Sequence, residues 1–132
     1  MEGRRDARER ALELLYEAQA KQISVAEVLA ALPVTPDAYA MSLVQGVEAH
    51  GDALDALLVR HVKQGWELAR MPVIDRSLLR LAAFELSHEP DVPLAVVINE
   101  AVELAKQFST DDAGRFVNGV LSGVAAEVRP GG

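Results

Sequence analysis

The apolar positions of this chain recur at helical spacing over most of its length. In ARERALELLYEAQAK, residues 7–21, alanine and leucine return every three or four positions and strong helix formers predominate. Similar patterns occupy VIDRSLLRLAAFELSHE at 73–89, LAVVINEAVELAKQF at 94–108 and AGRFVNGVLSGVAAEV at 113–128. No stretch alternates as a strand does. The pattern predicts an all-α fold, a compact bundle of six or seven helices.

Capping residues indicate where several of these helices begin. The first helix is predicted over residues 4–21. Ser24 followed by Glu27 is a capping-box pattern that opens a short second helix. Ser109 followed by Asp112 repeats that pattern before the last helix.

Proline and glycine divide the rest of the chain. Residues 35–37, Thr-Pro-Asp, open a longer segment in which Gly46 and the His50-Gly51 pair indicate either two helices or one bent helix. Residues 65–72 are interpreted as a connection, and 129–132 as a disordered tail.

The composition is that of a single helical domain spanning residues 1–132. Half of the residues are hydrophobic, mostly alanine, leucine and valine, and aromatic residues make up 5%. The absence of cysteine excludes disulfides and cysteine-based metal sites. The charged first residues do not form a secretory signal, and no run approaches the ~20 apolar residues of a membrane span. We therefore expect a cytoplasmic location.

The formal net charge of -7 is unevenly distributed. Residues 1–21 carry five basic and five acidic side chains, whereas residues 22–100 carry five basic and eleven acidic ones. Broad nucleic-acid binding is therefore disfavoured. A polyanion is expected to bind near the ends of the chain, and a basic partner near its centre.

The sequence offers no defensible catalytic, metal or cofactor site. His50, His61 and His88 are not at zinc-ligand spacing, and solvated or capping roles account for them better. No glycine-rich loop follows a strand, and no serine lies in a nucleophile elbow. We expect neither an enzyme nor a bound cofactor.

The basic run at the start, RRDARER, separates into two faces when it is placed on a helix. At roughly 100° per residue, Arg4, Arg5 and Arg8 form one arc, with Tyr16 just beyond it. This arc overlaps the apolar stripe, so the arginines are predicted to project, exposed, over the rim of the core. The helix N-terminus also favours an anion. The alternative is that the arginines only keep a helix end solvated.

Acidic residues near the arginines are expected to pair within the same helix. Asp6 lies four residues before Arg10, on another face, and Glu9 lies four after Arg5. Both are spacings of helical ion pairs.

A second basic and aromatic group surrounds the last interhelical turn. It comprises Lys106, Arg115 and Phe116. Phe116 belongs either to the core or to an exposed platform on which a base stacks. Asn118 either satisfies a buried backbone group or reaches a ligand.

Two glycines of the last helix lie four residues apart. Gly119 and Gly123 share one helix face. We interpret them as permitting close approach of a neighbouring helix backbone.

With these residues in view, the chain resembles the NusB family of bacterial transcription antitermination factors. The order and spacing of the matching stretches agree with the family along nearly the whole chain. These stretches are RRDARERALELLY at 4–16, DRSLLRLAAFELS at 75–87, DVPLAVVINEAVELAKQF at 91–108 and RFVNGVL at 115–121.

The resemblance implies an all-helical, non-enzymatic factor that binds boxA RNA of nascent ribosomal RNA together with NusE, a small-subunit ribosomal protein, in an RNA polymerase antitermination complex. The arginine-rich start of the family contacts RNA, and the matching positions are Arg4, Arg5 and Arg8. The family often has a third consecutive arginine where this chain has Asp6, which bears on the strength of RNA binding. The candidate RNA-binding residues are Arg4, Arg5, Arg8, Tyr16, Lys106, Arg115, Phe116 and Asn118, and the candidate partner-binding residues are Asp75, Arg76 and Asp112.

Two alternatives stay open at this point. A similar helical domain precedes the catalytic domain in RNA cytosine methyltransferases, so the chain could be a detached accessory domain. It could also be a structural homodimer whose arginines contact the second subunit.

Overall fold

The computed structural model describes residues 2–63 and 66–131, and within them the chain forms seven α-helices and one 3-10 turn without a strand. The predicted all-α bundle is therefore confirmed. The helices are α1 (Glu2–Lys21), α2 (Val25–Ala30), α3 (Ala38–Ala49), α4 (Gly51–Val59), α5 (Val73–His88), α6 (Leu94–Phe108) and α7 (Asp111–Val128), and the 3-10 turn spans Leu68–Arg70.

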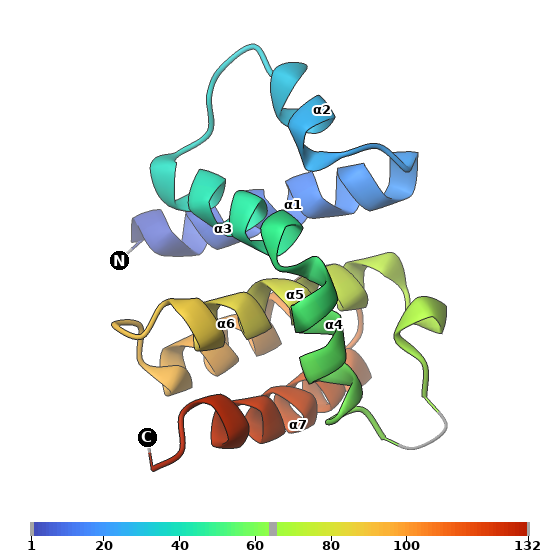
Figure 1. Cartoon of the computed structure of the whole chain (residues 1–132), viewed down its shortest axis with the longest axis vertical. Helices are drawn as coiled ribbons and strands as arrows, with labels where there is room; N and C mark the ends of the chain where they lie inside the picture. Colours follow the sequence, from blue (N-terminus) through green and yellow to red (C-terminus); the bar gives the residue numbers. More distant parts are fainter. Residues whose placement is uncertain (1, 64–65, 132) are drawn as a thin grey trace.

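Helix α5 is the centre of the bundle, because its residues are buried on nearly every side. It packs against α1, α3, α4, α6 and α7. Figure 1 shows α1, α2 and α3 together on one side of α5, and α6 and α7 on the other, with α4 running down between the two groups. Three of its buried leucines, Leu78, Leu79 and Leu81, are at most 1% exposed. Burying such a helix on all sides removes a large apolar area from water and sets the positions of its neighbours.

Two helix starts test the capping predictions. The box at Ser24 is confirmed, because the Ser24 hydroxyl accepts from the Glu27 amide and the Glu27 carboxylate accepts from the Ser24 amide. The prediction for Ser109 is wrong. Ser109 closes α6, and the next residue, Thr110, caps α7 by accepting from the amide of Ala113 at 3.0 Å. Serine and threonine are both favoured N-caps, so the pattern alone does not choose between neighbours.

The segment opened by residues 35–37 forms two helices, α3 and α4, which join at His50. Asp37 caps α3, as its carboxylate accepts from the amides of Tyr39 and Ala40. Gly46 does not interrupt α3. A Cβ atom at this position would overlap the ring of Phe84 on α5. Gly46 therefore lets an aromatic ring of the central helix approach the α3 backbone.

Of the predicted glycine pair in α7, Gly119 and Gly123, only Gly123 lies against a neighbour. A Cβ atom there would be 2.6 Å from Nδ1 of His61, which follows α4 and whose Nε2 lies 2.7 Å from Glu127. Nothing lies within 4 Å of a Cβ atom at Gly119, so the predicted close packing is wrong for that position. At Gly123 the close neighbour is a side chain and not a helix backbone.

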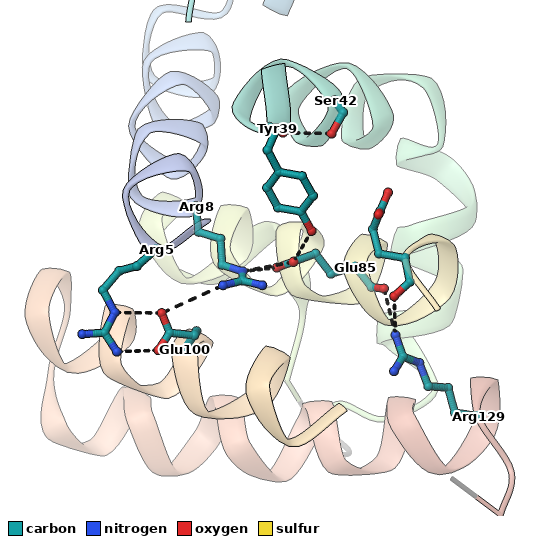
Figure 2. Close-up of polar contacts among 8 residues, drawn as sticks. Arg5, Arg8, Tyr39, Ser42, Glu85, Glu100 and Arg129 are labelled. Atoms are coloured by element: carbon teal, nitrogen blue, oxygen red, sulfur yellow. Dashed lines mark hydrogen bonds and ion pairs between the residues drawn. The ribbon is translucent and has the colours of Figure 1, made fainter. Parts of the chain in front are cut away.

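The chain end is held at Arg129, contrary to the prediction of a disordered tail beginning there. Its guanidinium donates to the carbonyl oxygens of Leu86 at 2.9 Å, Val92 at 2.6 Å and Glu89 at 2.8 Å. It also donates to that of Glu85 at 3.2 Å, and Figure 2 shows Arg129 beside Glu85. The last carbonyls of a helix lack partners within the helix. Arg129 supplies such partners at the end of α5, so the packed structure extends to Arg129.

Two further properties of the described residues bear on function. None of their helices is long and apolar enough to cross a membrane. Within residues 2–63 and 66–131, no group of three or more histidine, cysteine, aspartate or glutamate side chains is placed to hold a metal ion.

We predict opposite effects of alanine at Gly46 and Gly119. Gly46→Ala should destabilise the protein by about 1–3 kcal/mol, because the added methyl group meets the Phe84 ring in a packed core. Gly119→Ala should stabilise it by about 0.5–1 kcal/mol, because alanine favours a helix and has free space there. Urea unfolding of both variants measures this. Equal effects would contradict the assigned packing.

Candidate nucleic-acid interface

A buried ion pair lies beneath the basic start of α1. Arg8 is only 4% exposed, and its Nε donates to the two carboxylate oxygens of Glu85 on α5 at 2.8 and 3.0 Å. The hydroxyl of Tyr39 on α3 donates to the same carboxylate at 2.7 Å. Burial, the hydrogen bond to Glu85 and the charge of that carboxylate raise the pKa of Tyr39. Figure 2 shows three helices joined at one carboxylate.

Arg8 therefore does not belong to an exposed arginine arc, and the prediction of its exposure is wrong. It lies on the apolar stripe of α1 among Ala7, Ala11 and Leu12, all buried. A helical wheel gives the direction of a side chain but not how far the neighbouring helix extends. Because α5 already covers α1 at this turn, the direction that points Arg4 over the rim points Arg8 into the core.

The other two arginines are exposed and are held by long-range contacts. Arg5 makes a two-pronged pair with Glu100 on α6, with Nε 2.9 Å from Oε1 and Nη2 2.6 Å from Oε2. This hydrogen bond from Arg5 is the main cause that lowers the pKa of Glu100. The guanidinium of Arg4 lies 4.3 Å from the centre of the Tyr39 ring, a cation–π contact. Both cations thus have defined positions at the rim.

The pairings expected within α1 are replaced by others. Arg5 pairs with Glu100 where Glu9 was predicted, and Arg10 donates to Glu13 at 3.2 Å where Asp6 was predicted. Asp6 is exposed. These differences matter little for stability, because exposed helical pairs contribute only about 0.3–0.5 kcal/mol.

Two adjoining grooves follow α6 on either side of the Arg5–Glu100 pair. One has a volume of about 660 Å³ and the other about 300 Å³, and both include Arg5 and Glu100 in their walls. Arg4 lies in the larger and Lys106 in the smaller. The larger is lined by Arg4, Arg5, Arg8, Asp91, Val92, Pro93, Val96 and Glu100, and the smaller by Arg5, Glu9, Glu100, Glu103, Leu104, Lys106 and Gln107.

The grooves lead toward the start of α7. The side chain of Lys106 packs over Gly114, where a Cβ atom would lie 3.2 Å from its Cγ. Arg115, the next residue, is exposed and pairs with Asp112. The structure therefore brings Arg4, Arg5 and Lys106 onto one continuous surface along α6, with Arg115 beyond its end.

Phe116 is not an open platform. It is partly buried against the core, and Trp66 stacks on it with ring centres 5.2 Å apart and planes at 26°. Trp66 is itself 56% exposed. Asn118 is exposed, with its Oδ1 3.5 Å from the Ser122 hydroxyl, and so does not satisfy a buried backbone group. Tyr16, 45% exposed on α1, lines neither groove.

The three candidate partner-binding residues have different surroundings. Asp75 is only 8% exposed, so its carboxylate is not a free surface contact. Arg76 donates to the carbonyl oxygens of Leu68 at 3.1 Å and Ala69 at 3.3 Å, which fixes the 3-10 turn against α5. Asp112 is fully on the surface beside Arg115. Of the three, Asp75 is buried, Arg76 is partly exposed and bonded to the 3-10 turn, and Asp112 is exposed.

Sequence reasoning missed the carboxylates that organise this region. Glu85 lies in the middle of the apolar run LAAFEL, and a charged residue there signals a buried counter-ion. Glu100 gives no such signal in the sequence, because a glutamate at a partly exposed position of an amphipathic helix is expected to be solvated. Trp66 was overlooked since it falls in a connection without periodicity, although it is the only tryptophan of the chain.

Comparison with known proteins decides the family. The NusB family model matches residues 5–126. The chain belongs to the NusB family. The NusB transcription antitermination protein of Saccharopolyspora erythraea is 47% identical over 131 residues, covering 95% of this chain and 88% of that protein. Membership confirms the predicted family and fold, and it makes the protein a transcription antitermination factor and not an enzyme.

Solved NusB structures agree with this assignment. NusB of T. maritima matches with a TM-score of 0.85 and 34% identity, over 96% of this chain and 93% of that one. A chain from the crystal structure of antitermination factors NusB and NusE in complex with dsRNA matches with a TM-score of 0.81 and 28% identity, over 96% and 98% of the two chains.

The buried pair predicts different roles for neighbouring arginines. Arg8→Met should lower the free energy of unfolding by about 3–5 kcal/mol, because it leaves Glu85 buried without its cation. Arg5→Met should change it far less, because Arg5 is exposed to solvent. The free energies of unfolding of the two variants can be compared by urea denaturation monitored with circular dichroism. Similar losses in both variants would show that Arg8 does not support the fold.

Proposed function

We propose that this NusB-family protein binds boxA RNA of nascent ribosomal transcripts in the cytoplasm, jointly with NusE, and so supports processive transcription. The observation that carries the proposal is the surface along α6, where Arg4, Arg5 and Lys106 line two adjoining grooves. A related chain in complex with NusE and dsRNA supports both partners. Self-association as a homodimer stays a prediction.

The proposed mechanism is assembly and not chemistry. Arginine guanidinium groups bind phosphate oxygens strongly because their planar donors match the oxygen pairs. Arg4 and Arg5 would position the RNA backbone, and Lys106 would continue the contact toward α7. Bases of a single strand can then stack on aromatic faces, and Trp66 presents one. Arg8 contributes indirectly, by fixing α1 against α5.

The overall charge explains why a partner is needed. The protein carries a formal net charge of -7, and acidic side chains such as Glu100 and Asp91 lie in the groove walls. The cations therefore act locally, against an unfavourable long-range field. A basic ribosomal protein would reduce that field and extend the RNA surface. We infer weak RNA binding by the isolated protein and tighter binding with NusE.

The experiment is a titration of labelled boxA RNA at several salt concentrations, with and without purified NusE. The Arg4→Ala/Arg5→Ala variant should bind about tenfold more weakly or worse, with a salt slope shallower by about 0.7 for each phosphate that is no longer neutralised. Arg10→Ala/Lys21→Ala is the matched control. It removes the same charge from exposed positions of α1 that pair with Glu13 and Glu17.

The control variant should bind RNA nearly as wild type does. If it weakens binding as much as the Arg4 and Arg5 substitutions, only net charge matters and the proposed surface is wrong. If NusE leaves the affinity for RNA unchanged, the joint binding is wrong.

A further inference from the structure

The Arg5–Glu100 pair occupies the part of the grooves that an RNA phosphate would have to reach. Glu100 accepts from Nε and Nη2 of Arg5, the edge of the guanidinium that also fits two phosphate oxygens. The Arg5 side chain is 64% exposed and that of Glu100 only 16%. The cation is therefore accessible from solution, while its carboxylate partner is built into the wall.

Both grooves are lined by Glu100, so neither offers a route to Arg5 that avoids this negative charge. A phosphate that approached Arg5 without displacing the carboxylate would lie close to a like charge. Only an exchange of partners removes that repulsion.

A second cation is in place to accept the displaced carboxylate. Nη1 of Arg8 lies 4.0 Å from Oε1 of Glu100, and Nη2 of Arg8 is buried without a hydrogen-bond partner among the described residues. Figure 2 marks the contact between Arg8 and Glu100. A small movement of Glu100 toward Arg8 would bring Oε1 within hydrogen-bond distance of Nη1. Glu100 would then stay paired after Arg5 leaves it, which avoids an isolated charge in a partly buried site.

We propose, on the basis of the RNA-binding function above, that Glu100 sets the affinity for RNA by competing with phosphate for Arg5 and transferring to Arg8 when RNA binds. In the free protein, the Glu100 carboxylate occupies the Arg5 donors that a phosphate would use. An RNA can bind Arg5 only if its other contacts with the protein compensate for the free energy of breaking the Arg5–Glu100 pair. Weak or poorly matched RNA is thereby disfavoured.

The test is a double-mutant cycle on RNA affinity, measured with labelled boxA RNA and the full chain. Glu100→Gln should tighten binding roughly three- to tenfold, since it removes the competing charge but keeps the side-chain shape. Glu17→Gln is the matched control, because it makes the same charge change about 18 Å along α1 from Arg5, at a carboxylate paired with Lys21. It should leave the affinity nearly unchanged.

The cycle is completed with Arg5→Ala and Arg5→Ala/Glu100→Gln. If competition for Arg5 is the cause, Glu100→Gln should have little effect once Arg5 is gone. An equal gain in affinity with and without Arg5 would overturn the proposal in favour of a general charge effect. Unchanged or weaker binding by Glu100→Gln alone would also overturn it, since Glu100 would then be inert or would position Arg5 for RNA.

Two further measurements keep these outcomes interpretable. Glu100→Asp retains the charge but shortens the side chain and breaks the two-pronged pair, so it should also tighten binding, by less than Glu100→Gln. If circular dichroism shows that Glu100→Gln does not fold, the RNA affinity of Glu100→Asp tests the competition in its place. A wild-type chain that binds no boxA RNA, even with NusE, would contradict the proposed function itself. RNA binding that is intact but insensitive to Glu100 would contradict only the competition.

Discussion

The buried contact of Arg8 with Glu85 is the constraint on which the arrangement of this protein depends. A charge removed from water is tolerated only when a partner of opposite charge and suitable hydrogen bonds compensate it. Here the carboxylate from α5 receives the guanidinium from α1 and the hydroxyl of Tyr39 from α3. These three helices can satisfy one another only in one relative position. The start of α1 is thus fixed over the central helix.

The position of the proposed RNA surface follows from that constraint. With Arg8 fixed, the preceding turn of α1 extends past the core, and Arg4 and Arg5 lie at its rim. Arg4 rests on the ring of Tyr39, the residue that also bonds Glu85, so the buried network and the exposed cation share a side chain. Arg5 reaches Glu100 on α6. An acidic protein can in this way present a small cationic surface whose geometry is set from the interior.

Much of the fold could be predicted from local pattern, and the errors have physical causes. The periodicity of α5 and α6 and the capping box at Ser24 are properties of short segments, and the structure confirms them. Thr110 caps α7 where Ser109 was predicted, since two adjacent residues that both favour the N-cap cannot be separated by local pattern. Arg129 is ordered because it bonds carbonyl oxygens that lie about 40 residues earlier, which no local pattern reveals.

The same distinction applies to the candidate site. The helical wheel grouped the arginines correctly by direction, yet it could not separate buried Arg8 from exposed Arg5, since depth depends on α5. The partner of Arg5 lies 95 residues away in the sequence. The family resemblance indicated which residues belong to the surface. Their division into a buried structural arginine, Arg8, and an exposed one, Arg5, required the packed structure.

The division of roles between Arg5 and Arg8 can be observed directly by NMR of the arginine Nε–H groups during titration with boxA RNA. The account predicts that the Arg5 signal moves as RNA saturates the protein. The Arg8 Nε–H should exchange slowly with solvent in both states, because it stays bonded to Glu85. If Arg8 instead lost its slow exchange on RNA binding while the Arg5 signal stayed in place, Arg8 would be the RNA contact and the account would be contradicted.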